Sequence, residues 1–304
     1  MIMDYRVEVD FAPMYECLSS TIAFFHKQNH TSMDSGKEWV RRVQADFAPS
    51  LLQRMNEVVK VTEDFALSPF IWRCPGERTV SSFLDWFDGL SSGDLYELTA
   101  SFGSPVPPNL TEMRDRASDM LREWDNGYFR SIDPAILQGL EQEAEARRAL
   151  VEQAAPLEAV EDATQGMRFY STGRMKLVVL TPQYHTRPLV TSAIYDEYAF
   201  INYSCDVLPP ANGRPEAPLL RLTRALSDET RLYILRLLSG RQLSFTEIVK
   251  EVGLSKSTIH YHLIALRAAG LIIVHSGEKA SASYSLRPEA LKVLTERIGA
   301  YLKP

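Results

Sequence analysis

The segment from Leu208 to Pro218 constrains the fold most strongly, because its composition forbids regular structure. It reads Leu-Pro-Pro-Ala-Asn-Gly-Arg-Pro-Glu-Ala-Pro. Proline lacks the backbone N–H that a helix interior or an inner strand requires, so neither element can run through this stretch. We therefore expect a domain of residues 1–208, a proline-rich linker at 209–218 and a second domain of residues 219–304.

The net charge of the chain differs in sign on the two sides of this linker. The 33 Lys plus Arg and 39 Asp plus Glu residues give −6 overall, which taken alone argues against a nucleic-acid partner. From residue 214 onward there are 14 basic and 8 acidic residues, a balance of +6, which leaves −12 for the residues before it. A basic module is thus joined to an acidic one, and the acidic one should lie away from any phosphates.

Composition and termini favour a cytoplasmic globular protein. Apolar residues make up 45% and charged residues 24% of the chain, enough apolar material for a sizeable core. No apolar run approaches the roughly 18 to 20 residues of a membrane span, and the N-terminus lacks the order of a signal peptide. Cys17, Cys74 and Cys205 are too scattered for a disulfide framework or a thiolate metal site.

The C-terminal part has the pattern helix, helix, helix, helix, hairpin, helix. Asp228 is a cap for one helix, and Ser244 with Glu247 has the spacing of a capping box for the short next one, which Gly253 ends. Ser255 then caps a helix that we expect from residue 256 to 269. A short helix, a tight glycine-containing turn and a second helix are typical of a helix-turn-helix, whose second helix enters the major groove of DNA.

The second of these helices has two distinct faces. Its apolar stripe, which should face the domain core, consists of Ile259, Leu263 and Leu266. The opposite stripe is Ser257, His260, Tyr261, Ile264 and Ala268. After Gly270, two extended runs around a glycine-containing turn predict a hairpin, which beside a helix-turn-helix is a wing.

The last helix, starting at Pro288, has an apolar stripe of its own. The stripe has spacings of three, four and three residues and consists of Leu291, Leu294, Ile298 and Tyr301. Since a small domain that already has a core does not need this stripe internally, it is available to pair between subunits or to pack on the N-terminal domain. The sequence leaves both possibilities open.

With these elements, the C-terminal third of the chain resembles the ArsR-type (arsenic repressor-like) winged helix of bacterial and archaeal regulators. The segments that carry the resemblance are 225–232, Ile234-Leu235, 254–259, His262-Leu263, Leu266 and 269–272. It implies a homodimeric, DNA-binding transcriptional regulator whose first and last helices form the dimer interface, here Leu291, Leu294, Ile298 and Tyr301. Metal-sensing members use thiolates on the third helix or Asp and His on the last one. Neither pattern occurs here, so we expect no metal and no cofactor.

Geometry assigns roles to the residues of the predicted recognition helix. Ser255 and Thr258, near its N-terminus and the positive end of its dipole, suit a phosphate oxygen. Base edges should be met by Ser257, His260 and Tyr261, and phosphates by Lys256, Arg267 and, in the wing, Lys279. Lys279 is the weaker candidate, because Glu278 beside it repels a phosphate. His262 lies next to the buried stripe and should be packed inside the domain, and His275 is a further, weak wing candidate.

The N-terminal part is predicted to be a mostly helical α+β domain with a small sheet. Alternating apolar residues at 5–11 indicate a half-buried strand, and strand character returns at 167–170, 176–181 and 195–205. We expect these four segments to form the sheet. Helices should begin near Ala12, Gly36, Pro49, Thr79, Ser92, Thr111 and Asp133.

No motif in the N-terminal part supports catalysis. It has no G-x-S-x-G, P-loop, G-x-G-x-x-G or C-x-x-C sequence. His26 and His30 are one helical turn apart, but no acidic residue completes a zincin-like pattern, and ordinary packing is the favoured interpretation. The four Trp residues, all in this part, either fill a core or line an apolar ligand pocket, and we favour the core.

The sequence therefore predicts a cytoplasmic homodimeric repressor that is not an enzyme and binds double-stranded DNA without contact with a membrane. The resemblance in layout to long ArsR-like regulators suggests that the N-terminal domain senses a small organic effector or a partner. Two alternatives remain. In one, the winged helix has lost DNA binding and the chain is a protein-interaction module; in the other, an enzyme is fused to a regulator domain.

Overall fold

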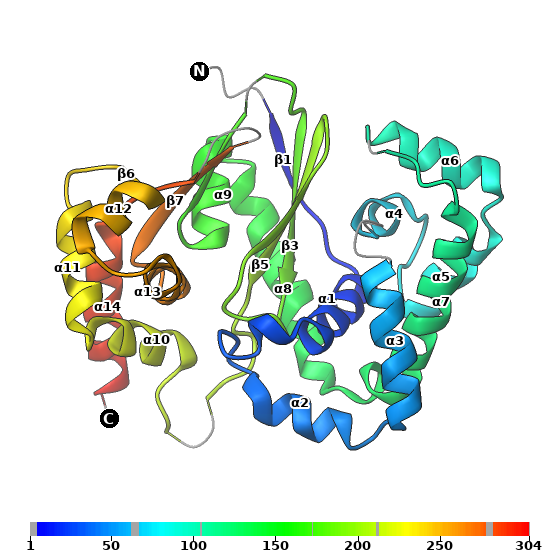
Figure 1. The fold of residues 1–304 in the computed structure, drawn as a ribbon, viewed down its shortest axis with the longest axis horizontal. Coiled ribbons are helices and arrows are strands. Elements are labelled where there is room, and N and C mark those ends of the chain that lie inside the picture. Colours follow the sequence, from blue (N-terminus) through cyan, green and yellow to red (C-terminus); the bar gives the residue numbers. More distant parts are fainter. Residues whose placement is uncertain are drawn as a thin grey trace. The chain divides into compact units, whose positions relative to one another are not determined.

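A computed structural model of the protein describes residues 5–61, 67–103, 105–171, 173–210, 213–277 and 282–303. The chain forms two compact units, and most of their elements are labelled in Figure 1. The N-terminal unit comprises Arg6–Ala149 and Arg174–Val207, and the C-terminal unit comprises Tyr5, Leu150–Gly173 and Leu208–Pro304. The division at Leu208 lies at the start of the proline-rich stretch, but residues 150–173 group with the end of the chain, which the expected domain ranges did not include.

A four-stranded sheet with the order β1-β3-β5-β4 forms one part of the N-terminal unit. Its strands are β1 (Arg6–Val9), β3 (Leu177–Gln183), β4 (Thr191–Ile194) and β5 (Tyr198–Ser204). β1 and β5 both pair in parallel with β3, and all the side chains of β3 are buried, as expected for a parallel strand covered on both faces. The strand predicted from the alternation at 5–11 is confirmed, whereas β4, a short and partly exposed edge strand, was not predicted.

Helices form the rest of this unit, and the expected helix starts are confirmed to within one residue. They are α1 (Pro13–Phe25), η1 (Lys27–Asn29), α2 (Gly36–Gln44), α3 (Pro49–Val61), α4 (Ser68–Arg73), α5 (Val80–Gly89), α6 (Ser92–Ser101), α7 (Leu110–Gly127), η2 (Phe129–Ser131) and α8 (Pro134–Val151). The signals that predicted them are local, such as the hydroxyl of Thr79 that accepts the N–H of Ser82 at 3.2 Å. The short α4 was not predicted.

The helical core is aromatic. The indole of Trp124 is fully buried, stacks on Phe47 and contacts Phe24 and Phe25. Trp39 is also buried, and the half-buried Trp72 packs against Phe102 and Phe200. These contacts support the interpretation of the Trp residues as core.

The C-terminal unit has the predicted order of elements. They are α10 (Ala217–Leu226), α11 (Glu229–Leu238), β6 (Leu243–Ser244), α12 (Phe245–Val252), α13 (Lys256–Ala268), β7 (Ile272–Gly277), β8 (Ser283–Leu286) and α14 (Glu289–Tyr301). α13 packs against α10, α11 and α12, and β7 pairs antiparallel with β8. The fold is a winged helix-turn-helix, which confirms the predicted α+β class.

A strand from earlier in the chain completes this unit. α9 (Pro156–Thr164) leads into β2 (Met167–Tyr170), which pairs in parallel with β7 to give a second sheet with the order β2-β7-β8-β6. The prediction that residues 167–170 belong to the N-terminal sheet is therefore wrong. Periodicity identified the strand correctly but carries no information about its partner, and β7 offered a free edge.

Candidate nucleic-acid interface

The turn between α12 and α13 is fixed by local hydrogen bonds. The Ser244 hydroxyl accepts the N–H of Glu247 at 3.3 Å, and the Glu247 carboxylate accepts the N–H of Ser244 at 2.7 Å, which is the predicted capping box. Gly253, with a φ of 77°, ends α12 in the left-handed region that favours glycine. The Ser255 hydroxyl then accepts the N–H of Thr258 at 3.2 Å and begins α13. These local bonds and the conformation of Gly253 fix a tight turn between α12 and α13 (Figure 1).

The two faces of α13 are separated as the sequence predicts. Ile259, Leu263 and Leu266 are buried in the core of the unit. The exposed residues of the opposite face are Lys256, Ser257, His260 and Tyr261, and the Tyr261 side chain is 63% exposed. α13 contains no acidic residue, and Lys256 forms no ion pair with any residue that the structure describes. A rigidly held helix thus presents hydrogen-bonding groups and a cation to solvent.

Three hydroxyls cluster at the N-terminus of α13. The Ser255 hydroxyl lies 2.9 Å from that of Ser257 and 2.8 Å from that of Thr258. They surround the end of the helix where the macrodipole is positive, which favours an anion. This arrangement suits a phosphate oxygen, the role predicted for Ser255 and Thr258; Ser257 belongs to the same cluster, and its contact with a base edge stays a prediction.

Arg267 does not occupy the position expected of a phosphate-binding residue. Its Nη1 donates to the carbonyl oxygen of Thr164 at 3.0 Å, and its Nη2 is buried with no partner among the described residues. Burial, and then the charge of Arg287, lower its pKa to about 10. This hydrogen bond holds the Arg267 side chain against the α9–β2 turn and away from the exposed face of α13, which disfavours a phosphate contact, and the assignment of Arg267 stays a prediction.

The other basic candidates have different outcomes. Lys279 and its neighbour Glu278 lie outside the described residues, so the role of the wing tip stays a prediction. His262 is buried, as expected, with Nδ1 3.7 Å from the carboxylate of Asp228, the residue that caps α11. His275 is buried in the wing between the Tyr170 hydroxyl, 3.0 Å from Nδ1, and the Ser285 hydroxyl, 2.8 Å from Nε2. It joins β2 to β7 and β8, which makes it unsuitable as a phosphate contact.

The last helix exposes most of its predicted apolar stripe. Leu291 is 51%, Ile298 36% and Tyr301 46% exposed, whereas Leu294 is half-buried against the core of the unit. Leu302, directly after the helix, is 70% exposed. Exposed leucine, isoleucine and tyrosine along one helix are typical of an interface, and the prediction of a dimer interface here remains open.

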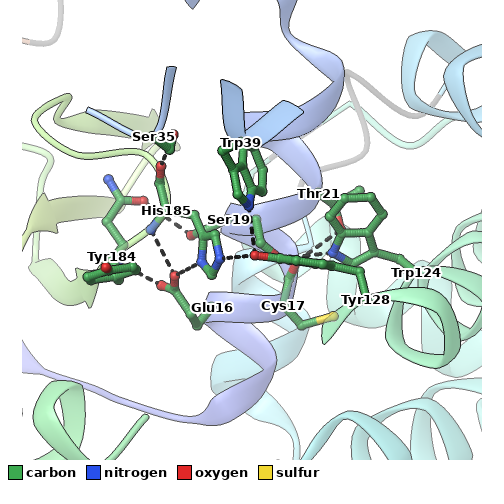
Figure 2. Close-up of polar contacts among 12 residues, drawn as sticks. Glu16, Cys17, Ser19, Thr21, Ser35, Trp39, Trp124, Tyr128, Tyr184 and His185 are labelled. Atoms are coloured by element: carbon green, nitrogen blue, oxygen red, sulfur yellow. Dashed lines mark hydrogen bonds and ion pairs between the residues drawn. The ribbon is translucent and has the colours of Figure 1, made fainter. Parts of the chain in front are cut away.

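The N-terminal unit contains a buried polar cluster that the sequence did not reveal (Figure 2). The Glu16 carboxylate, fully buried on α1, accepts the backbone N–H groups of Tyr184 and His185 at 3.0 and 2.9 Å and lies 2.5 Å from His185 Nδ1. His185 Nε2 lies 2.7 Å from the Tyr128 hydroxyl, which also accepts the indole N–H of Trp39 at 2.8 Å. With Nδ1 protonated and Nε2 accepting, every one of these polar groups has a partner.

The hydrogen bonds of this cluster join parts of the N-terminal unit that are far apart in the sequence. The Glu16 carboxylate holds the loop after β3 on α1. Among the described residues, no group of His, Cys, Asp and Glu is arranged to hold a metal ion. The Nε2 of His30 donates a hydrogen bond to the carbonyl oxygen of Phe24 at 2.9 Å. No helix within the described ranges combines the length and the apolar character of a membrane span.

The structure and its relatives agree on the class of the C-terminal domain. The turn geometry, the buried stripe of α13 and the paired wing strands define a winged helix-turn-helix. The family described as "Bacterial regulatory protein, arsR family" matches residues 228–274, so this segment is an ArsR-family helix-turn-helix domain.

One curated protein matches the chain significantly. No solved structure does. The curated protein is the "Uncharacterized HTH-type transcriptional regulator YceK" of Bacillus subtilis (strain 168), which is 45% identical over 53 residues. The match covers 17% of this chain and 53% of that protein, so the chain spans about half the length of the curated relative.

Proposed function

We propose that this protein is a sequence-specific DNA-binding transcriptional regulator that acts as a homodimeric repressor. The observation that carries the proposal is the exposed, acid-free face of α13 within an ArsR-family domain. Two such helices in a dimer would enter successive major grooves about 34 Å apart. The exposed stripe of α14 supports the dimer, and a small organic effector or a partner acting through the N-terminal unit is part of the same proposal.

Binding to DNA is tested first by its dependence on salt. Genomic fragments selected by the protein would supply a specific duplex, and fluorescence anisotropy would compare it with a random duplex between 50 and 200 mM salt. Because neutralised phosphates release counterions, about six to ten phosphate contacts would weaken binding by roughly 10³ to 10⁵ over this range. Absence of binding to any duplex at low salt would refute the proposal and favour a protein-interaction module.

Substitutions on α13 then separate base reading from phosphate binding. Tyr261→Ala should weaken binding to the specific duplex by about 1 to 3 kcal/mol and leave binding to random DNA unchanged. Lys256→Ala should weaken both alike, because a phosphate contact carries no sequence information. Equal losses on both duplexes for Tyr261→Ala would contradict its assignment to a base edge.

A further inference from the structure

One segment of the C-terminal unit comes from the middle of the chain and lies at the edge of the wing. It consists of α9 and β2, residues 156–170, and is called the strap below. β2 is the edge strand of the sheet β2-β7-β8-β6 and pairs in parallel with β7 over four residues. A short parallel pairing at the edge of a sheet is a weak one, so the strap can open locally while the core of the unit stays folded.

The strap contacts both of the elements that would face DNA. The carbonyl oxygen of Thr164, at the end of α9, accepts Nη1 of Arg267 on α13 at 3.0 Å. Two residues further on, the carbonyl oxygen of Gly166 accepts the N–H of Val274 on β7 at 2.7 Å. The strap thus fixes the C-terminal end of α13 and the first strand of the wing relative to each other.

Attachment of the strap has a cost, which lies in the polar groups that it buries. Nη2 of Arg267 is buried without a partner among the described residues, and burial, followed by the charge of Arg287, lowers the pKa of Arg267 to about 10. The buried ring of His275 lies between the hydroxyl of Tyr170 on β2 and that of Ser285 on β8. Release of the strap would return both basic groups to water, which offsets part of the free energy of the lost contacts.

The strap also lies where the chain passes between the two units. The chain passes from one unit to the other four times, at 5–6, 149–150, 173–174 and 207–208. The second and third passages are at the two ends of the segment that contains the strap. At the first passage, the hydroxyl of Tyr5 donates to the carbonyl oxygen of Phe169 in β2 at 2.8 Å. A rearrangement of the N-terminal unit would therefore act on the strap through three of the four passages.

We propose that the strap is detachable, that its attachment holds α13 and the wing in the arrangement that binds DNA, and that its release lowers DNA affinity. A recognition helix and a wing that are already fixed relative to each other lose less conformational freedom when they bind. The effect on DNA rests on the proposed function, whereas release of the strap does not and is measured without DNA.

Gly166→Ala is the variant that releases the strap. A Cβ at this position would lie 2.6 Å from the carbonyl oxygen of Ile272, and φ at Gly166 is 122°. Because the clash is with the backbone that leads into β7, β2 has to move away from β7. Gly173→Ala is the matched control, since Gly173 belongs to the same segment and has a φ of 98°, but a Cβ there would meet open space.

Hydrogen exchange followed by mass spectrometry on the full-length protein measures release in the absence of DNA. In the wild type, β2 should exchange faster than α11 and α13, because local opening needs less free energy than unfolding of the core. Gly166→Ala should speed the exchange of β2 and of Val274 by about tenfold or more, and Gly173→Ala should exchange like the wild type. In the anisotropy assay, a variant with about one tenth of its molecules attached should bind the specific duplex about tenfold more weakly.

Two outcomes would overturn the proposal. If β2 of the wild type exchanges only as fast as α11 and α13, the strap does not detach separately from the core. If Gly166→Ala speeds the exchange of β2 at least tenfold but binds the specific duplex like Gly173→Ala, release of the strap does not control DNA affinity.

A milder variant covers the case in which Gly166→Ala fails to fold. Tyr170→Phe removes only the hydroxyl that lies 3.0 Å from His275 Nδ1, and it should speed the exchange of β2 about threefold to tenfold. Exchange equal to that of the wild type would count against the proposal in the same way. If the wild type binds no duplex at all, the proposed function fails, and the exchange data still decide whether the strap detaches.

Discussion

Replacement of Glu16 by Gln removes the charge at the centre of the buried cluster without changing its volume. The carboxylate accepts three hydrogen bonds, from the N–H groups of Tyr184 and His185 and from His185 Nδ1. The amide oxygen of Gln can serve the two donors of His185, but its NH₂ group then faces the N–H of Tyr184. An unsatisfied buried donor costs about 1 to 3 kcal/mol, and loss of charge from the two remaining bonds about 1 kcal/mol each. We expect Glu16→Gln to lower the free energy of unfolding of the N-terminal unit by about 3 to 5 kcal/mol.

Tryptophan fluorescence during urea unfolding measures this effect selectively, because all four Trp residues belong to the N-terminal unit. Glu97→Gln, an exposed glutamate on α6, is the control and should change the free energy of unfolding by less than about 0.5 kcal/mol. If the two variants unfold within 1 kcal/mol of each other, Glu16 is not the acceptor that holds the loop after β3, and the reasoning is refuted.

Three further predictions concern the C-terminal unit. Arg267→Met should leave DNA affinity within about twofold of the wild type, because the Arg267 side chain contacts Thr164 and does not lie on the exposed face of α13. If the anisotropy assay shows a loss of affinity as large as that of Lys256→Ala, Arg267 is a phosphate contact after all. Burial lowers the pKa of His275, so the folded state favours the neutral ring and its contribution to stability is present above about pH 6.5 and lost as the pH falls below that value. Thermal melts followed by circular dichroism from pH 7.5 to 5.5 should therefore show a steeper fall of the melting temperature with falling pH in the wild type than in His275→Gln. Equal dependence of the melting temperature on pH in the two proteins would contradict this. Ile298→Asp should shift the protein from dimer to monomer in sedimentation, whereas the exposed Thr295→Asp on the same helix should not.

The winged helix could be predicted from sequence because its signals are local. The capping box at Ser244 and Glu247, the left-handed Gly253 and the cap at Ser255 each act within three or four residues, and together they fix where two helices begin and end. The division of α13 into a buried and an exposed face follows from its period alone. The exposed positions of Lys256, the candidate phosphate contact, and of His260 and Tyr261, the candidate base contacts, could therefore be predicted without the fold.

The features that sequence reasoning missed depend on partners far away in the chain. Glu16 and His185 are separated by more than half of the chain, and nothing near either residue marks them as neighbours. Arg267 is a second example. Its position late in α13 suggests a solvent-exposed cation, but in the structure it donates to the carbonyl oxygen of Thr164, a partner that the sequence does not reveal. Periodicity predicts which face of an element is buried but not which element covers it.

The placement of β2 also changes what the proline-rich stretch means. As a sequence feature it separates the winged helix from everything before it, but the structure shows that the C-terminal unit needs residues from the other side. β2 covers the edge of β7, the N–H of Val274 donates to the carbonyl oxygen of Gly166 at 2.7 Å, and Phe169 is fully buried in this unit. Residue 5 and both ends of the segment 150–173 are also joined by the chain to the N-terminal unit, so the C-terminal unit is covalently linked to that unit four times, and not only at the start of the proline-rich stretch. A fragment beginning at residue 219 would lack β2 and the carbonyl group of Thr164 that accepts from Arg267, so α13, the candidate recognition helix, depends on the chain before the prolines.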